Sequence, residues 1–411
     1  MTRPAEADSR QAWLRLVVAL MLMTIGSSAM YVIAVVLPSV QKEFGVARAD
    51  AALPYTLLMI GFGVGGIFMG RLADRRGVAL PILIGSAGLA VGFVGAGMSS
   101  SLTAFALVHG VLLGLFGASA TFAPLVADTS LWFVKRRGVA VAVCASGNYL
   151  AGAIWPPIVQ HYVATVGWRP TYIGLGVFCL VAMPPLAFFM RARPPALAAA
   201  PASLRGAVPS TLPFGLSMNA AQTLLCIAGV ACCVAMAMPQ VHIVAYCGDL
   251  GYGAARGAQM LSLMLACGIV SRLVSGVICD RIGGLRTLLL GSVLQGLALL
   301  LFLPFDSLGS LYVISAMFGL FQGGIVPSYA IIVREHFPAD EAGARVGTVI
   351  MFTLLGMALG GWMSGKVFDL TGSYHAAFLN GLAWNALNVS IALFLLGRTR
   401  GWLQRRPPIA A

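Results

Sequence analysis

Twelve long apolar segments run through this chain of 411 residues. A helix rises 1.5 Å per residue, so about 20 apolar residues cross the roughly 30 Å hydrocarbon layer of a bilayer. Hydrophobic residues make up 59% of the chain and charged residues only 9%, and an aqueous fold could not bury that much apolar surface. We therefore expect an all-α membrane protein with twelve transmembrane helices at residues 14–37, 51–70, 79–98, 103–126, 138–160, 169–190, 217–245, 257–279, 286–304, 309–332, 344–365 and 375–397.

The basic residues orient these helices. If both termini are cytoplasmic, 20 of the 26 Lys and Arg residues lie on that side and five on the other, and the remaining one, Arg272, lies within a span. Lys and Arg gather in cytoplasmic loops, so the sequence predicts a multi-pass protein of a bacterial-type inner (plasma) membrane with cytoplasmic N- and C-termini. The first apolar run is too long for a signal peptide, and we expect it to remain as the first span.

A net charge of +13 could indicate a nucleic-acid partner. The basic residues instead form short clusters between apolar runs, without a continuous basic face, so we expect no nucleic acid. The expected partners are membrane lipid and a small-molecule solute. The eight cysteines lie in apolar stretches without CxxC or Cys/His spacing, so we expect neither a metal nor a cofactor.

One motif occurs twice, 206 residues apart, after the second and the eighth span. Its two copies contain Gly70, Asp74, Arg75, Gly77, Gly276, Asp280, Arg281 and Gly283. Between the copies, a stretch rich in Pro, Ala and Ser is typical of a flexible linker. The sequence thus predicts an N-terminal six-helix bundle at residues 1–190, a cytoplasmic linker at 191–216 and a C-terminal six-helix bundle at 217–411.

The repeated Gly-x-x-x-Asp-Arg-x-Gly motif resembles the signature of the major facilitator superfamily. With twelve spans and a long central loop, the resemblance covers the whole chain. It implies two pseudo-symmetric bundles that rock around a midplane site, and we expect a monomer. It also implies that Asp74 and Asp280 lie at the N-termini of spans 11 and 5, where a helix dipole favours an acid by about 0.3–1 kcal/mol. Such contacts would latch the cytoplasmic side shut; alternatively, the motif only orients the chain.

Small residues let transmembrane helices approach closely. Span 2 carries Gly61, Gly65, Gly66 and Gly70, and span 11 carries Gly356, Gly360, Gly361 and Gly365, each at four-residue spacing. In the superfamily these two spans face each other across the bundles. The resemblance therefore implies that the glycines form smooth sliding surfaces between the two halves.

Arg272 is the most informative single residue. It lies eight positions before Asp280, which places it about 12 Å into the membrane. A cation at that depth costs at least about 2.5–3.5 kcal/mol and normally has a partner. No Asp or Glu occurs at a similar depth, so the missing anion could be the substrate. Alternatively, Arg272 extends toward the cytoplasm or bonds backbone carbonyls.

A second resemblance concerns the same region. Ser271-Arg272 with Gly276, Met238 to Gly251, and Trp132-Phe133 with Gly138 are similar to segments of the monocarboxylate and oxalate/formate branch of the superfamily. That branch uses an Arg in span 8 to hold a carboxylate. It often has an acid four residues before this Arg, where the present chain has Gly268.

Further polar residues within spans are candidates for the same cavity, although such residues also form interhelical hydrogen bonds. They are Tyr31 in span 1, Asn148 and Tyr149 in span 5, Gln240 in span 7 and Gln322 in span 10. His109 and His242 lie in the outer third of their spans. Each is a possible proton-coupling residue, because histidine titrates near neutral pH, and packing is the alternative. In span 4, Val108-His109-Gly110 stands where the family's motif opens with Arg.

These observations favour a secondary active transporter of a small organic anion, a mono- or dicarboxylate, by symport or exchange. No P-loop occurs, so ATP is not the expected driver. An exporter of amphipathic drugs or neutral metabolites is the alternative. A non-transporting receptor or membrane enzyme is more remote, because the spans carry no paired carboxylates, HExxH or GxSxG, and we expect no enzyme.

Overall fold

The computed structural model describes residues 8–192, 212–338 and 341–404, and the regular structure within these ranges is entirely helical. The elements are α1 (Arg10–Gly26), α2 (Ser28–Phe44), α3 (Arg48–Arg76), α4 (Ala79–Gly97), α5 (Leu102–Val108), the π-helix η1 (His109–Ala118), α6 (Ser119–Trp132), α7 (Arg137–Val166), α8 (Trp168–Phe189), the short 3₁₀ turn η3 (Pro213–Gly215), α9 (Met218–Asp249), α10 (Ala254–Ile282), α11 (Gly284–Leu301), α12 (Leu308–Gln322), α13 (Ile325–His336), α14 (Ala342–Thr371) and α15 (Tyr374–Gln404).

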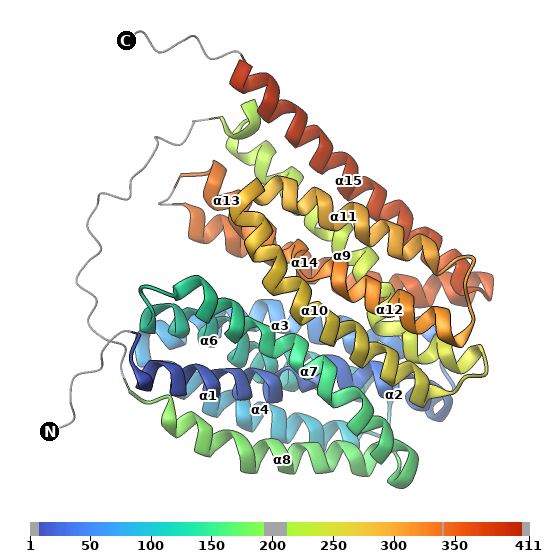
Figure 1. Ribbon diagram of the computed structural model, residues 1–411. Helices are drawn as coiled ribbons and strands as arrows, with labels where there is room; N and C mark the ends of the chain where they lie inside the picture. The colour runs from blue at the N-terminus through green and yellow to red at the C-terminus, as the bar shows by residue number, and fades with distance from the viewer. Residues whose placement is uncertain (1–7, 193–211, 339–340, 405–411) are drawn as a thin grey trace, which may run out of the picture.

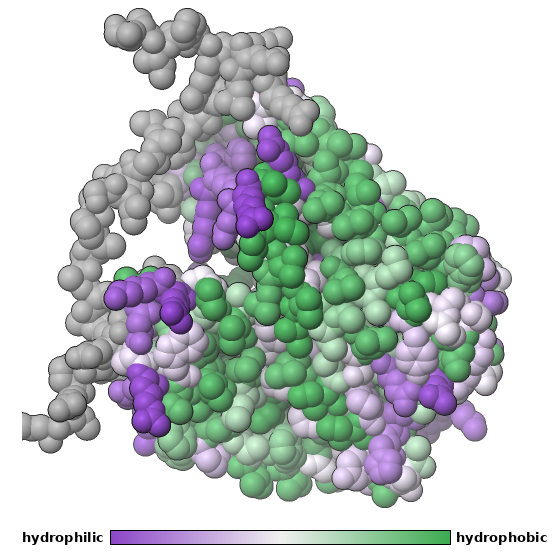
Figure 2. Space-filling model, viewed as in Figure 1, coloured by the Kyte–Doolittle hydropathy of each residue, from purple (hydrophilic) through white to green (hydrophobic). Residues whose placement is uncertain are grey.

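Twelve spans of the described chain are long and apolar enough to cross a membrane. Three of them combine consecutive elements: α1 with α2, α5 with η1 and α6, and α12 with α13. The prediction of an all-α protein with twelve transmembrane helices is therefore confirmed. Apolar side chains cover the middle of the visible surface in Figure 2, and hydrophilic ones gather at the two ends. This is the distribution that lipid requires.

The helices form two bundles (Figure 1). The N-terminal bundle comprises α1–α8 and the C-terminal bundle α9–α15, and they meet along α3 with α14, α7 with α10, and α2 with α9. The start of α1, the end of α8, the start of α9 and the end of α15 all lie on one side, which we call the termini side. Most of the predicted linker at 191–216 lies outside the described residues.

The glycines of α3 pack mainly inside their own bundle. A methyl group on Gly61 would lie 2.0 Å from the Gly110 carbonyl oxygen, and one on Gly65 would lie 2.2 Å from the Leu115 carbonyl oxygen. Both contacts are with η1, the π-helical part of span 4. The expectation that these two glycines form a sliding surface between the bundles is therefore wrong; they let two backbones of one bundle touch.

The glycines of α14 divide between the two bundles. Gly356 and Gly360 pack on α9 of their own bundle, where a methyl group would lie 2.6 and 2.5 Å from carbonyl oxygens. Gly361 and Gly365 instead face α3, against Tyr55 and Ala49. Of these four glycines, the two that contact the other bundle therefore lie in the part of α14 far from the termini side.

Both copies of the repeated motif end a helix with a tight turn. Gly77 and Gly283 have φ values of 82° and 84°, a conformation that only glycine adopts easily. Their N–H groups bond carbonyls four residues back at 2.8 Å. Asp74 and Asp280 are exposed, and neither forms an ion pair with another described residue. The predicted latch, which would place these acids at the N-termini of α14 and α7, stays a prediction.

Candidate functional site

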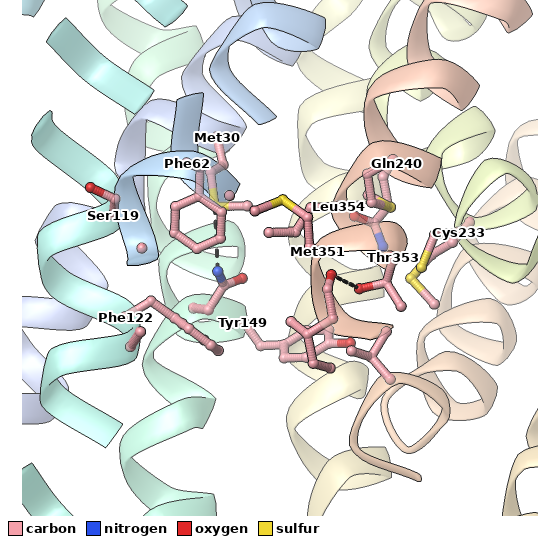
Figure 3. Close-up of a pocket in the computed structure, with 18 of the residues that line it drawn as sticks. Met30, Phe62, Ser119, Phe122, Tyr149, Cys233, Gln240, Met351, Thr353 and Leu354 are labelled. Carbon is pink, nitrogen blue, oxygen red and sulfur yellow. Dashed lines mark hydrogen bonds between the residues drawn. The ribbon is translucent and has the colours of Figure 1, made fainter. Parts of the chain in front are cut away.

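A cavity of about 390 Å³ lies between the two bundles. Its walls come from α2, α3, α6 and α7 on one side and from α9, α10, α13 and α14 on the other. Figure 3 shows Met30, Phe62 and Phe122 of the N-terminal bundle opposite Met351 and Leu354 of α14, with Tyr149 between them. The site is therefore shared by both halves of the chain.

The cavity reaches the termini side. Its lining includes Gly66 of α3 and Gly347, which lies in the second turn of α14. Figure 2 shows a hollow between the bundles on that side, with hydrophilic residues on both rims. On the opposite side, Gly361 and Gly365 bring α14 against α3. The structure is thus open toward the termini side and closed at the other.

Arg272 is the one charged side chain among the described residues that line this cavity. Its Nη1 donates to the Ala145 carbonyl oxygen at 2.9 Å, and its guanidinium carbon lies 4.4 Å from the centre of the Tyr149 ring. Its Nε is buried and has no hydrogen-bond partner. None of the carboxylates in the described ranges pairs with it. A cation that lines a cavity and has a buried, unused donor is suited to binding an anion.

Gly268 explains where the Tyr149 ring lies. It precedes Arg272 by one helical turn, and a methyl group at this position would lie 2.6 and 2.7 Å from two Tyr149 ring carbons. The absence of a side chain on Gly268 therefore leaves the space that the ring occupies beneath the guanidinium. An acidic side chain at the same position would compete for that space.

Four of the five uncharged candidates form two hydrogen-bonded pairs. Tyr31 Oη donates to Asn148 Oδ1 at 2.5 Å, and Gln240 Nε2 donates to Gln322 Oε1 at 2.7 Å. Tyr31, Asn148 and Gln240 line the cavity together with Arg272 and Tyr149. Gln322 is fully buried behind Gln240 and does not line it.

The two candidate histidines lie outside the cavity. His109 is buried, with Nδ1 2.8 Å from the Phe105 carbonyl oxygen and Nε2 3.2 Å from the Tyr172 hydroxyl, so both ring nitrogens are satisfied in the neutral form. His242 is buried with Nε2 2.7 Å from the Gly361 carbonyl oxygen, and its Nδ1 has no partner. These environments favour packing; proton coupling by either residue stays a prediction.

The closed side carries contacts that the sequence analysis did not anticipate. The Asp369 carboxylate, at the end of α14, accepts the backbone N–H groups of Arg48 and Ala49 at 2.8 Å each. These are the first N–H groups of α3, which have no partner within their own helix. One carboxylate of the C-terminal bundle thus caps a helix of the N-terminal bundle, where the helix dipole also favours an anion.

The Arg48 side chain extends the same contact. The residue is buried, with 7% of its surface exposed. Its Nη1 lies 3.1 Å from Asp249 Oδ2 and also donates to the Tyr374 hydroxyl. The Phe368 ring centre is 4.7 Å from its guanidinium carbon. We call Arg48, Asp249, Asp369 and Tyr374 the Arg48 lock, because they join the two bundles on the side opposite the opening.

Comparison with known proteins agrees with this architecture. The family model of the Major Facilitator Superfamily matches residues 16–308 and 260–411. The chain belongs to this superfamily. It is therefore a membrane transporter and not an enzyme. A solved superfamily structure, the bacterial homologue of the human lysosomal transporter Spinster in an inward-facing and occupied conformation, matches 98% of this chain and 100% of its own with a TM-score of 0.69 at 15% identity, which shows the fold.

Several superfamily transporters are similar in sequence. The agnestins efflux protein AgnL12 of Paecilomyces divaricatus is 25% identical over 81% of this chain and 75% of its own length. Monocarboxylate transporter 13 of Rattus norvegicus is 27% identical over 75% and 71% of the two chains. Monocarboxylate transporter 4 of Gallus gallus is 25% identical over 82% and 72%. The relatives thus include both efflux and monocarboxylate transporters.

Proposed function

We propose that this protein is a secondary active transporter that binds a small organic anion, a mono- or dicarboxylate, at Arg272. The observation that carries the proposal is the guanidinium of Arg272 in the shared cavity, whose Nε is buried and unpartnered and which has no carboxylate partner among the described residues. The similarity to monocarboxylate transporters 13 and 4 supports the same class of substrate. Transport would proceed by symport or exchange in a bacterial-type plasma membrane, with both termini cytoplasmic and the protein a monomer.

The cavity suits alternating access because one of its ends is open and the other is closed. In this conformation the termini side, which we take as cytoplasmic, is open, and the Arg48 lock closes the other side. In the opposite conformation the lock would separate, and Asp74 and Asp280 would approach the first turns of α14 and α7. Arg272 would then face the outer side without leaving its helix.

Export of an amphipathic neutral product is the second candidate. Methionine and aromatic side chains form much of the cavity wall, and the similarity to the agnestins efflux protein agrees with such a cargo. The two candidates differ in whether the cargo must carry a carboxylate. That difference can be measured directly.

The test is thermal unfolding of the purified protein with a panel of carboxylates and their neutral amides, on wild type and Arg272→Ala. A ligand at about 100 times its Kd stabilises the folded state by about 2.7 kcal/mol. We expect stabilisation by carboxylates only. Loss of charged hydrogen bonds worth about 1.5–3 kcal/mol should weaken binding to Arg272→Ala by roughly 10- to 150-fold.

Arg256→Ala is the matched control, because Arg256 is exposed and its side chain bonds only Gln259 among the described residues. It should bind carboxylates like wild type. If carboxylates still stabilised Arg272→Ala, the role of Arg272 would be structural, through its hydrogen bond to the Ala145 carbonyl. Equal stabilisation by the amides would favour export of neutral cargo.

Gly268→Ala should weaken carboxylate binding by about 2- to 30-fold, the range that corresponds to losing a cation–π contact. The new methyl group would displace the Tyr149 ring from beneath Arg272. Isothermal titration of the two proteins with the same carboxylate measures the change. Gly174→Ala is the control, because a methyl group there meets no atom within 4 Å. An unchanged Kd in Gly268→Ala would show that the ring does not position the guanidinium.

A further inference from the structure

The charges of the cavity restrict the anion more narrowly than the proposed function does. Among the described residues of the lining, Arg272 is the only one that carries a charge. A second carboxylate on the ligand would be buried without a cation, and an ammonium group would be buried without an acid. Either costs several kcal/mol in a cavity of low polarity. The site therefore fits a ligand with a single negative charge.

Most polar side chains of the wall other than Arg272, Tyr55 and Tyr149 are already bonded to the protein. Tyr31 bonds Asn148, and Gln240 bonds Gln322. Ser119 and Thr353 donate their hydroxyls to the carbonyls of their own helices at 2.6 and 2.7 Å. Few polar groups remain for a hydroxylated body such as that of a sugar acid. The body that this wall can hold without losing hydrogen bonds is apolar.

The apolar part of the wall is shaped by aromatic rings and thioethers. Phe62 and Phe122 form an edge-to-face pair, with centres 5.9 Å apart and planes at 68°, on the N-terminal bundle. Met351 and Leu354 of α14 lie opposite them, and Met30 lies near Phe62 (Figure 3). Aromatic faces and methionine sulfur both make favourable contacts with a ring. A cavity of about 390 Å³ lies in the range that encloses ligands much larger than a two- or three-carbon acid.

We propose that the ligand of this cavity is a monocarboxylate with an aromatic body. Its carboxylate binds Arg272, and its ring lies between the Phe62–Phe122 pair of one bundle and Met351 and Leu354 of the other. This inference rests on the proposed function and narrows it: it excludes dicarboxylates, amino acids and short hydroxy acids as the preferred cargo. Phe122 is thereby a specificity-determining residue, whereas Arg272 serves every carboxylate.

The experiment compares binding and proteoliposome counterflow for benzoate, phenylacetate and 3-phenylpropionate with acetate, lactate, succinate, phenylalanine and benzamide. We expect at least one aryl acid to bind about tenfold or more tightly than acetate, lactate, succinate and phenylalanine, and benzamide not to bind. Phe122→Ala should weaken aryl-acid binding by about tenfold and leave lactate binding unchanged. Phe122→Leu, which keeps most of the volume, should show a smaller loss in the same direction.

Phe116→Ala is the matched control, because Phe116 is 39% exposed on the outer surface of the same span and does not line the cavity. Its ligand preference should equal that of wild type. Binding of lactate or succinate as tight as that of the aryl acids, still lost in Arg272→Ala, would overturn this inference and keep the proposed function. Aryl-acid binding that is unaffected by Arg272→Ala, or matched by benzamide, would overturn the proposed function itself.

Discussion

Asp369→Ala is expected to open the side of the transporter that is closed in this structure. The substitution removes two hydrogen bonds, of 2.8 Å each, between a carboxylate of one bundle and the first turn of α3 in the other. Hydrogen bonds to a charged group contribute about 1.5–3 kcal/mol each, so their loss should shift the equilibrium between conformations by roughly 100-fold or more. Arg48→Ala should act in the same direction, because it removes the bonds to Asp249 and Tyr374.

Distances between spin labels measure this shift. Labels at Lys42→Cys and Asp306→Cys, both exposed and in different bundles on the closed side, should move apart in Asp369→Ala in a background without the native cysteines. The distance between labels at Lys135→Cys and Arg334→Cys on the termini side should become shorter. Arg256→Ala, an exposed charge change on the closed side, should leave both distances unchanged. Wild-type distances in Asp369→Ala would show that apolar packing alone closes this side.

Asp128→Ala is expected to lower the free energy of unfolding by about 3–5 kcal/mol, because it leaves Arg15 buried without its anion. Arg15 and Asp128 form a two-pronged pair at 2.8 and 3.0 Å, and Arg15 also bonds the Met190 carbonyl oxygen at 2.9 Å. Its guanidinium carbon lies 4.6 Å from the Trp132 ring centre. The pair therefore joins spans 1, 4 and 6 of the N-terminal bundle. Equilibrium unfolding in detergent measures the loss.

Two further variants identify the cause of the stability loss in Asp128→Ala. Arg15→Met combined with Asp128→Leu removes both charges and should recover most of the lost stability. Glu341→Ala breaks an ion pair with Arg345 in which the acid is half exposed, and it should change stability by no more than about 1 kcal/mol. If the double variant were as unstable as Asp128→Ala, the buried charge would not be the source of the loss.

The spans could be predicted from the sequence because lipid imposes a length and a composition on each of them. Several predicted ends fell short because charged residues continue the helices beyond the apolar core. The second span, expected at 51–70, is the helix Arg48–Arg76, and its end residues Arg48 and Arg76 are both charged. The depth of Arg272 could likewise be counted along one helix, and the structure places it in the cavity.

Contacts between distant helices could not be predicted in this way. Arg48 and Asp369 are 321 residues apart, and each appears in the sequence as an isolated charge at the end of a span. Helical spacing places Gln322 on a polar face of its helix. It does not tell whether the Gln322 side chain lines a cavity or bonds a neighbouring side chain such as Gln240. The same limit explains why the packing of Gly61 and Gly65 was predicted wrongly, because their spacing is compatible with contact with either bundle.

The unpaired guanidinium of Arg272 has an electrical consequence for a transporter that works as proposed. With a bound monocarboxylate the cavity is neutral, whereas the empty cavity holds one positive charge. Each elementary charge that crosses a potential of 100 mV changes the free energy by about 2.3 kcal/mol. Return of the empty transporter should therefore depend on voltage, and an inside-negative potential should hold it open to the cytoplasm. The rate of exchange of one bound anion for another should not depend on the membrane potential, because only the neutral loaded form crosses. Measuring the rate at different potentials would therefore distinguish exchange from net transport.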